Sequence, residues 1–106
     1  MDNEVCVVMT TCPDAASAEQ LAGVLVECRL AACVSLGSEI TSVYPWQGRI
    51  EREREIPLTI NTTRGRVDEL KKQLIANHPY DVPELLVVPV VEGLDTYLNW
   101  IRDWTR

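Results

Sequence analysis

The sequence predicts an α+β fold in which the elements follow the order β-α-β-β-α-β, with one further helix at the end. Two stretches rich in β-branched residues, 4–12 and 85–91, are typical of buried strands. Residues 50–60 alternate strictly between two faces, which predicts a long strand. Residues 15–30 and 64–77 instead carry apolar side chains at helical spacing.

The first strand reads EVCVVMTTC, and the Pro13–Asp14 pair ends it. The side chain of Asp14 is expected to accept a hydrogen bond from a free amide in the first turn of the next helix. Ser17 and Gln20 offer a capping box as the alternative start. The helix is predicted over 15–30 from apolar residues recurring at helical spacing: Ala18, Leu21, Ala22, Leu25 and Cys28.

An extended β-hairpin is predicted over residues 38–62. Gln47 and Gly48 offer a tight turn between its two strands. On the second strand, the isoleucines and arginines share one face and the glutamates share the other. Pro57 removes one donor from the ladder, which predicts an edge or a bulge at that point.

The second half of the chain repeats the pattern of helix and strand. Thr63 is the expected cap of the helix over 64–77, and Pro79 ends it, because the residue before a proline is disfavoured in the α region. The strand over 85–91 is apolar on both faces. The final helix is predicted from Leu94, Tyr97, Leu98, Ile101 and Trp104.

This order defines a ferredoxin-like fold, in which two βαβ units interlock into a four-stranded antiparallel sheet with two helices on one face. The hairpin is long for such a small sheet. The last strand is an edge in this topology, yet it is apolar on both faces, and an edge of that kind invites pairing. We therefore expect other copies of the chain to cover the hairpin and this strand.

The composition indicates one globular domain over residues 1–106, with 46% hydrophobic and 25% charged residues. The net charge is −6 and the basic residues alternate with acids, which argues against a nucleic-acid partner. No run of 18 apolar residues occurs, so no membrane-spanning segment is expected. The acidic N-terminus lacks the positive charge of a secretory signal, which predicts a cytoplasmic protein.

The four cysteines show no CxxC pair and no zinc-finger spacing. Without export, disulfides are not expected. Cys6, Cys28 and Cys33 are interpreted as small buried apolar residues. Cys12 lies at a strand end beside Pro13, where an accessible thiol is expected.

Three stretches together resemble the CutA family, the divalent-cation tolerance proteins. They are TTCPDAASAEQLAGVLVECRLAACV (10–34), SVYPWQGRIEREREIPLTINTT (42–63) and HPYDVPELLVVPVVEGLDTYLNWI (78–101). The resemblance covers nearly the whole chain in the right order. It implies a small cytoplasmic homotrimer associated with tolerance to copper and other divalent cations. The architecture also resembles that of the PII signalling trimers, which bind small effectors in clefts between subunits.

The resemblance implies a soft metal site built from one cysteine and two adjacent histidines, which are ligands that copper prefers. In this chain the cysteine position is Thr10, the first histidine position is Asn77, and only His78 matches. The candidate ligands for Cu²⁺ or another divalent cation are therefore His78 and the nearby Cys12. The alternative is that His78, the only histidine, ends a helix by donating to its free carbonyl groups.

A cleft between subunits is the second candidate site. Aromatic residues with a polar tip suit the edges of a pocket. Ordinary core or intersubunit packing is the alternative for them, and a solvated or ion-paired carboxylate is the alternative for the glutamate at 55. Asn61 stands where the family often has a lysine. The candidate cleft residues are Thr10, Tyr44, Trp46, Glu55, Asn61, Tyr80 and Glu84, with Trp100 as a further aromatic.

No arrangement of residues favours an enzyme. The chain has no Ser/His/Asp or Cys/His set with a histidine to spare, no phosphate-binding glycine loop and no HExxH. Three hypotheses remain for its function. The protein binds a divalent metal weakly as a trimer, it binds a metabolite or partner between subunits, or it is a structural trimer without a specific ligand.

Overall fold

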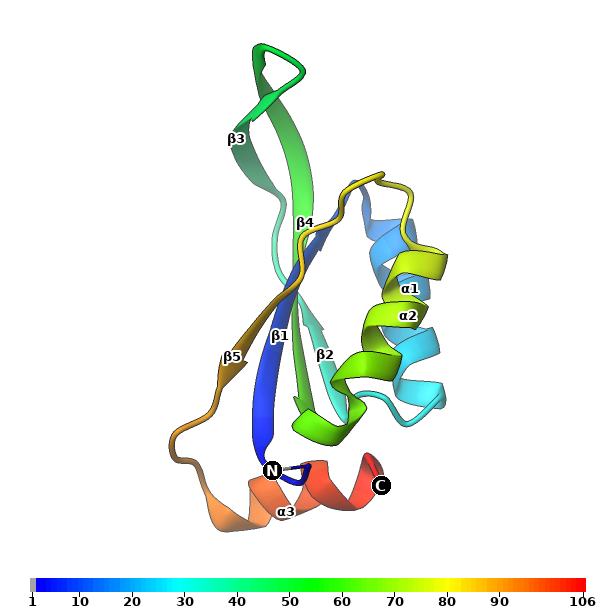
Figure 1. Cartoon of the computed structure of the whole chain (residues 1–106), viewed down its shortest axis with the longest axis vertical. Helices are drawn as coiled ribbons and strands as arrows, with labels where there is room; N and C mark the ends of the chain where they lie inside the picture. Colours follow the sequence, from blue (N-terminus) through cyan, green and yellow to red (C-terminus); the bar gives the residue numbers. More distant parts are fainter. Residues whose placement is uncertain (1) are drawn as a thin grey trace.

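The computed structural model of the chain describes residues 2–106 (Figure 1). The elements are β1 (Val5–Cys12), α1 (Ala15–Glu27), β2 (Cys33–Leu36), β3 (Ile40–Trp46), β4 (Arg49–Thr63), α2 (Val67–Asn77), β5 (Leu86–Pro89) and α3 (Asp95–Trp104). A short 3₁₀ turn over Arg64–Arg66 precedes α2. The predicted order of strands and helices is confirmed. None of the helices described here combines the length and the apolar character needed to cross a bilayer.

The sheet has the strand order β2-β4-β1-β5, and every pair is antiparallel. Within residues 2–106, β3 lies off this path and pairs only with the first half of β4. Helices α1 and α2 lie together on one face of the sheet, and α3 lies across its lower end (Figure 1). This is the ferredoxin-like arrangement that the sequence predicts.

The hydrophobic core fills the space between the sheet and the helices α1 and α2. Val8 of β1 pairs directly with Ile60 of β4 and with Val87 of β5, so these side chains share the covered face. Both Val8 and Ile60 are fully buried. The helices contribute the leucines that complete this cluster: Leu21, Leu25, Leu70 and Leu74.

The β3–β4 hairpin extends well beyond the helices (Figure 1). Its turn is formed by Gln47 and Gly48, which both have positive φ angles, 49° and 81°. Two consecutive positive φ angles are typical of the type I′ turn, which matches the twist of a hairpin. The predicted turn is confirmed. A two-stranded hairpin is only marginally stable by itself in water, and Val43 and Ile50 are more than half exposed on it.

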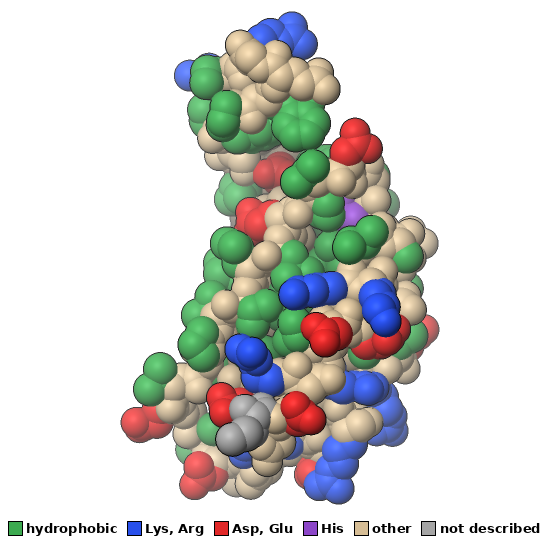
Figure 2. All heavy atoms as spheres, viewed as in Figure 1, with side chains coloured by type: hydrophobic (Ala, Val, Ile, Leu, Met, Phe, Trp, Pro, Cys, Tyr) green, Lys and Arg blue, Asp and Glu red, His purple; other side chains and the backbone are tan. Residues whose placement is uncertain are grey.

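The opposite face of the sheet is open except at its lower end, where Ile101 of α3 packs with Val5 of β1. Met9, Leu86 and Val88 lie on this open face with exposed fractions of 42%, 57% and 45%. β5 pairs only with β1 in the described part of the chain, so the last strand is an edge, as predicted. Figure 2 shows hydrophobic side chains gathered along the left of the view, from the hairpin down past β5.

Two details of the helix ends differ from the predictions. α1 begins as expected, with Asp14 Oδ1 accepting from the Ser17 amide at 2.8 Å. It ends at Glu27 instead of residue 30, and Arg29 follows with a φ of 59°. Thr63 does not cap α2, because it is still part of β4, paired with Val5. Its hydroxyl bonds the hydroxyl of Thr105 at 3.0 Å instead.

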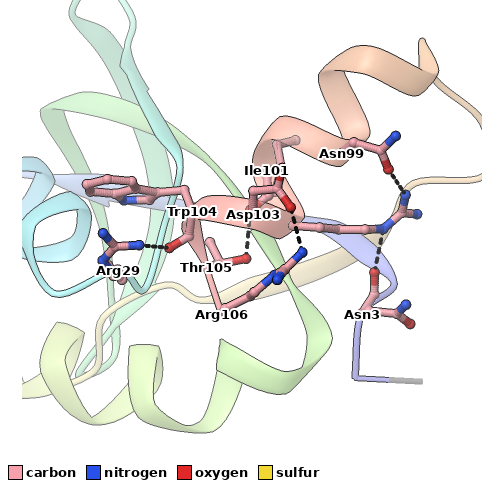
Figure 3. Close-up of polar contacts among 9 residues, drawn as sticks. Asn3, Arg29, Asn99, Ile101, Asp103, Trp104, Thr105 and Arg106 are labelled. Carbon is pink, nitrogen blue, oxygen red and sulfur yellow. Dashed lines mark hydrogen bonds and ion pairs between the residues drawn. The ribbon is translucent and has the colours of Figure 1, made fainter.

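Trp104, near the end of the chain, packs and hydrogen-bonds against the C-terminal end of α1 and the turn that follows it (Figure 3). The guanidinium of Arg29 lies 4.1 Å from the centroid of the Trp104 ring, and it also donates to the Trp104 carbonyl at 3.4 Å. The indole Nε1 of Trp104 donates to the Val26 carbonyl at 3.0 Å. A cation over an aromatic face and a hydrogen-bonded indole both hold α3 in place.

Replacing Trp104 with alanine is expected to lower the free energy of unfolding by about 2 kcal/mol, since the half-buried ring, its hydrogen bond and the cation–π contact are lost together. Urea denaturation at a fixed protein concentration measures the change. Arg106→Ala is the matched control, because it removes only an exposed ion pair with Asp103, and such pairs contribute about 0–1 kcal/mol. Equal stability of the two variants would contradict the conclusion that Trp104 makes the main contacts that hold α3 against the rest of the fold.

Candidate functional site

A cleft of about 570 Å³ lies between the hairpin and residues 79–84, the segment that connects α2 to β5. In Figure 1 this segment is the yellow strand-free stretch beside the base of the hairpin. The cleft brings together five of the residues predicted for it, from both sides of the opening: Tyr44, Trp46, Glu55, Tyr80 and Glu84.

The local sequence explains the position of both walls. Pro79 follows His78, the C-cap of α2, and Pro83 lies four residues further on, so the connecting segment takes no regular helix or strand. On the other wall, β4 continues past the main sheet to pair with β3. By the two-residue alternation of a strand, Glu55 lies on the same face of β4 as Thr59, which is the open face.

The carboxylate of Glu55 is the most buried acidic group of the cleft, with 7% of the residue exposed. Its Oε2 atom accepts two hydrogen bonds, from Thr11 Oγ1 at 3.0 Å and from the Tyr80 hydroxyl at 2.9 Å. The expectation of a solvated or ion-paired glutamate is therefore wrong. The end of β1 and the 79–84 segment cover this part of the hairpin and supply hydroxyl donors in place of water.

The two tyrosines of the cleft have raised pKa values. Burial raises the pKa of Tyr80, and the hydrogen bond to Glu55 with its negative charge adds to this effect. Burial also raises the pKa of Tyr44, and the negative charges of Glu53, Glu55 and Glu51 raise it further. The Tyr80 phenol therefore remains protonated near neutral pH and acts as the donor to Glu55.

His78 lies behind the cleft and is 9% exposed. Its Nε2 donates to the Thr11 carbonyl at 2.6 Å, and its Nδ1 accepts from the Tyr80 amide at 3.2 Å. This pair of partners assigns the proton to Nε2. The imidazole also lies against the Tyr80 ring, with centroids 4.8 Å apart.

His78 ends α2, as predicted, but its hydrogen bond differs from the expected one. Its backbone is extended, with φ −107° and ψ 134°, which turns the ring away from the last helical carbonyls. The ring reaches β1 instead. His78 Nε2 therefore links the end of α2 to the end of β1, and Nδ1 holds the Tyr80 amide of the segment that follows.

The cysteines differ from the predictions in their exposure. Cys12 is only 1% exposed and belongs to the main core, so the expectation of an accessible thiol is wrong. Residues 8, 10 and 12 of β1 alternate onto the face that the helices cover, which explains the burial. Burial, and then the charges of Asp14 and Glu55, raise the pKa of the Cys12 thiol. Cys28 is exposed and Cys33 half-buried, whereas both were expected to be buried.

His78 and Cys12 do not fit a soft copper site in this conformation. A metal needs the lone pair of an imidazole nitrogen and a deprotonated thiol. Here the Nδ1 lone pair accepts a hydrogen bond, and the thiol is buried with a raised pKa. Across residues 2–106 no group of three or more His, Cys, Asp or Glu side chains could hold a metal ion. Metal binding by His78 and Cys12 stays a prediction without support from the geometry.

Three residues predicted for the cleft lie outside it. Thr10 is buried on the covered face of β1, where its hydroxyl donates to the Glu84 carbonyl at 2.7 Å. Asn61 donates to the Tyr97 hydroxyl at 2.8 Å, towards α3. Trp100 lies on α3 beside Tyr97, with ring centroids 5.6 Å apart. Asn61 lies on the open face of the sheet, and Trp100 lies near the end of the chain.

Six residues of the cleft were not predicted from the sequence, and two of them bear on its chemistry, Thr11 and Asp81. Thr11 follows Thr10 directly, so the alternation of β1 places it on the other face, next to Glu55. That alternation was the available signal for Thr11. Asp81 lies in the HPYDVPE stretch, where its charge was visible but its orientation was not.

The fold and the site define a small ferredoxin-like protein with an acidic, aromatic-lined cleft at the base of a long hairpin. Comparison with known proteins identifies the family within this class. Residues 6–104 match the family described as CutA1 divalent ion tolerance protein. The chain belongs to this family, and the resemblance found in the sequence is confirmed.

Individual relatives agree with this assignment. The chain is 42% identical over 99 residues to the divalent-cation tolerance protein CutA of Thermus thermophilus, covering 93% of this chain and 96% of the relative. The crystal structure of CutA from Xylella fastidiosa matches with a TM-score of 0.95 and 44% identity, covering 97% of this chain and 99% of that one. Human protein CutA is 42% identical over 96 residues, but this chain spans only 54% of it.

Proposed function

We propose that this protein acts in tolerance to divalent cations as a binding protein, and that cations enter the cleft beside the hairpin. The observation that carries this proposal is the buried carboxylate of Glu55, which is bonded only by hydroxyl groups. Asp81 and Glu84 add two further carboxylates to the lining, and no Lys, Arg or His side chain of the described residues lines the cleft. An acidic cleft with apolar walls attracts positive ions.

The proposed divalent cation, Cu²⁺ or another, binds weakly beside the Glu55 carboxylate as a largely hydrated ion rather than through His78 and Cys12, since no group of three His, Cys, Asp or Glu side chains among the described residues could coordinate it. Carboxylate oxygens and water are ligands that many divalent ions accept. Asp81 and Glu84 are exposed and contribute their charge rather than a shared set of ligands, so water supplies most of the coordination. The result is a site of low affinity that responds to elevated metal concentrations. This role is one of binding rather than catalysis.

The experiment is a calorimetric titration of untagged protein with Cu(II) and Zn(II). Glu55→Gln is expected to weaken binding by about tenfold, because a charged partner of the cation becomes neutral. Cys12→Ser is the matched control and is expected to leave the affinity unchanged. Unchanged affinity in Glu55→Gln, or a loss in Cys12→Ser, would place the metal elsewhere.

We also propose that the working form is a cytoplasmic homotrimer, the assembly that the family resemblance implies. The open face of the sheet and the exposed apolar residues of the hairpin support association with further copies of the chain. The cleft borders both of these surfaces, which supports its position between subunits. The four cysteines are free, in accord with a reducing compartment.

A further inference from the structure

Glu55 has an acceptor that no described residue uses. Both of its hydrogen bonds fall on Oε2, and Oε1 accepts none from residues 2–106. The residue is nine-tenths buried and lines the cleft. No buried side-chain oxygen of the described residues lacks a partner, so Oε1 is open to the cleft, where a donor can reach it. The cleft therefore offers a position for a hydrogen-bond donor of its ligand.

The charges around the cleft favour a donor that carries a positive charge. Asp81 and Glu84 lie on the same lining as Glu55, and no basic side chain of the described residues balances them there. Glu51 and Glu53 of the hairpin act on Tyr44 in the same direction. Negative groups in partly desolvated surroundings repel anions and favour a cationic ligand.

The walls of the cleft favour a cation that has an apolar part. Tyr44, Trp46 and Tyr80 line the cleft, and aromatic faces attract cations that have shed part of their water. Val43 and Val82 add exposed apolar surface at its edge. A hydrated metal ion gains nothing from such walls, whereas an organic cation buries its carbon atoms against them. The volume of about 570 Å³ lies in the range of small-molecule sites.

We infer that the cleft binds a small organic cation, a primary ammonium group attached to an apolar body. The ammonium donates to Glu55 Oε1 at the back of the cleft, and the apolar body lies between the hairpin aromatics and the 79–84 segment. This inference rests on the cleft being the cation site proposed above, and it deepens that proposal by naming a ligand class that needs no set of metal ligands.

The test uses n-butylammonium as the probe and n-butanol as its neutral isostere. Isotope-labelled protein is titrated with each, and the indole signal of Trp46 is followed by NMR. Saturable binding of n-butylammonium is expected, with n-butanol at least about tenfold weaker, because the neutral hydroxyl gains no charge-assisted bond. Tetramethylammonium is expected to bind between the two, since it has the charge but no N–H donor.

Variants locate the site. Glu55→Gln is expected to weaken n-butylammonium by about tenfold, and Asp81→Asn and Trp46→Leu by a few-fold each. Glu69→Gln removes an equal charge from the exposed surface of α2 and is the matched control, with no change expected. Asp81 is exposed, so Asp81→Asn keeps the test valid even where Glu55→Gln perturbs folding.

The outcomes separate this inference from the proposed function. Equal binding of n-butylammonium and n-butanol, or no binding of either, overturns the inference, and metal binding that depends on Glu55 then still supports the proposed function. Failure of both cation classes overturns both. Binding of n-butylammonium that depends on Glu55, without metal binding, supports the inference and overturns the metal proposal.

Discussion

Replacing Val88 with aspartate is expected to leave the chain folded but to convert the proposed trimer into monomers. Val88 lies on the edge strand β5 and is 45% exposed on the open face, next to Leu86 and Met9. A monomer of this size rarely exposes a continuous apolar face of this kind. In an assembly, the aspartate would be desolvated against apolar partners, which costs several kcal/mol per subunit interface.

Light scattering after gel filtration measures the effect, since one chain has a mass of 11.9 kDa and the proposed trimer three times that mass. Ile75→Asp is the matched control. Ile75 is 65% exposed on α2, away from the open face, so the same change in charge and volume is expected to leave the assembly intact. A Val88→Asp protein that keeps the mass of the unchanged protein would show that β5 is not an interface.

The long strand β4 shows what a sequence pattern can and cannot establish. Alternation correctly placed Ile50 and Ile60 on one face. The structure exposes 62% of Ile50 and none of Ile60, because α1 and α2 cover only the half of β4 that pairs with β1. An aspartate at Ile60 would therefore unfold the chain and not test its assembly. Which half of a strand is covered depends on the length of helices elsewhere in the chain.

The cleft was predictable where the signal was local. Tyr44 and Trp46 belong to the hairpin and Tyr80 to the proline-bounded segment, and the sequence proposed all three as cleft residues. The burial of Glu55 was not predictable, because its partners Thr11 and Tyr80 are 44 and 25 residues away in the chain. The same reason explains the wrong expectation for Cys12, whose burial depends on α1 and α2.

His78→Ala is expected to lower the free energy of unfolding by about 3 kcal/mol, a larger effect than that of the exposed residues around it. The substitution leaves the Thr11 carbonyl and the Tyr80 amide without their partners and opens a void behind the cleft. Urea denaturation at a fixed protein concentration measures it. Asn77→Ala is the neighbouring control, since it removes only side-chain bonds to the backbone and side-chain oxygens of Gln73 one turn earlier.

The structural role of His78 and a role as metal ligand predict different behaviour of His78→Gln. A glutamine amide can still donate to the Thr11 carbonyl, so part of the lost stability is expected to return, and Cu(II) affinity is expected to change little because the cleft carboxylates remain. A ligand would give the reverse pattern, with copper affinity falling at least about tenfold while stability stays near that of the unchanged protein. Since both ring nitrogens already have partners, a metal could bind only by breaking the bond to the Thr11 carbonyl of β1 or the bond from the Tyr80 amide.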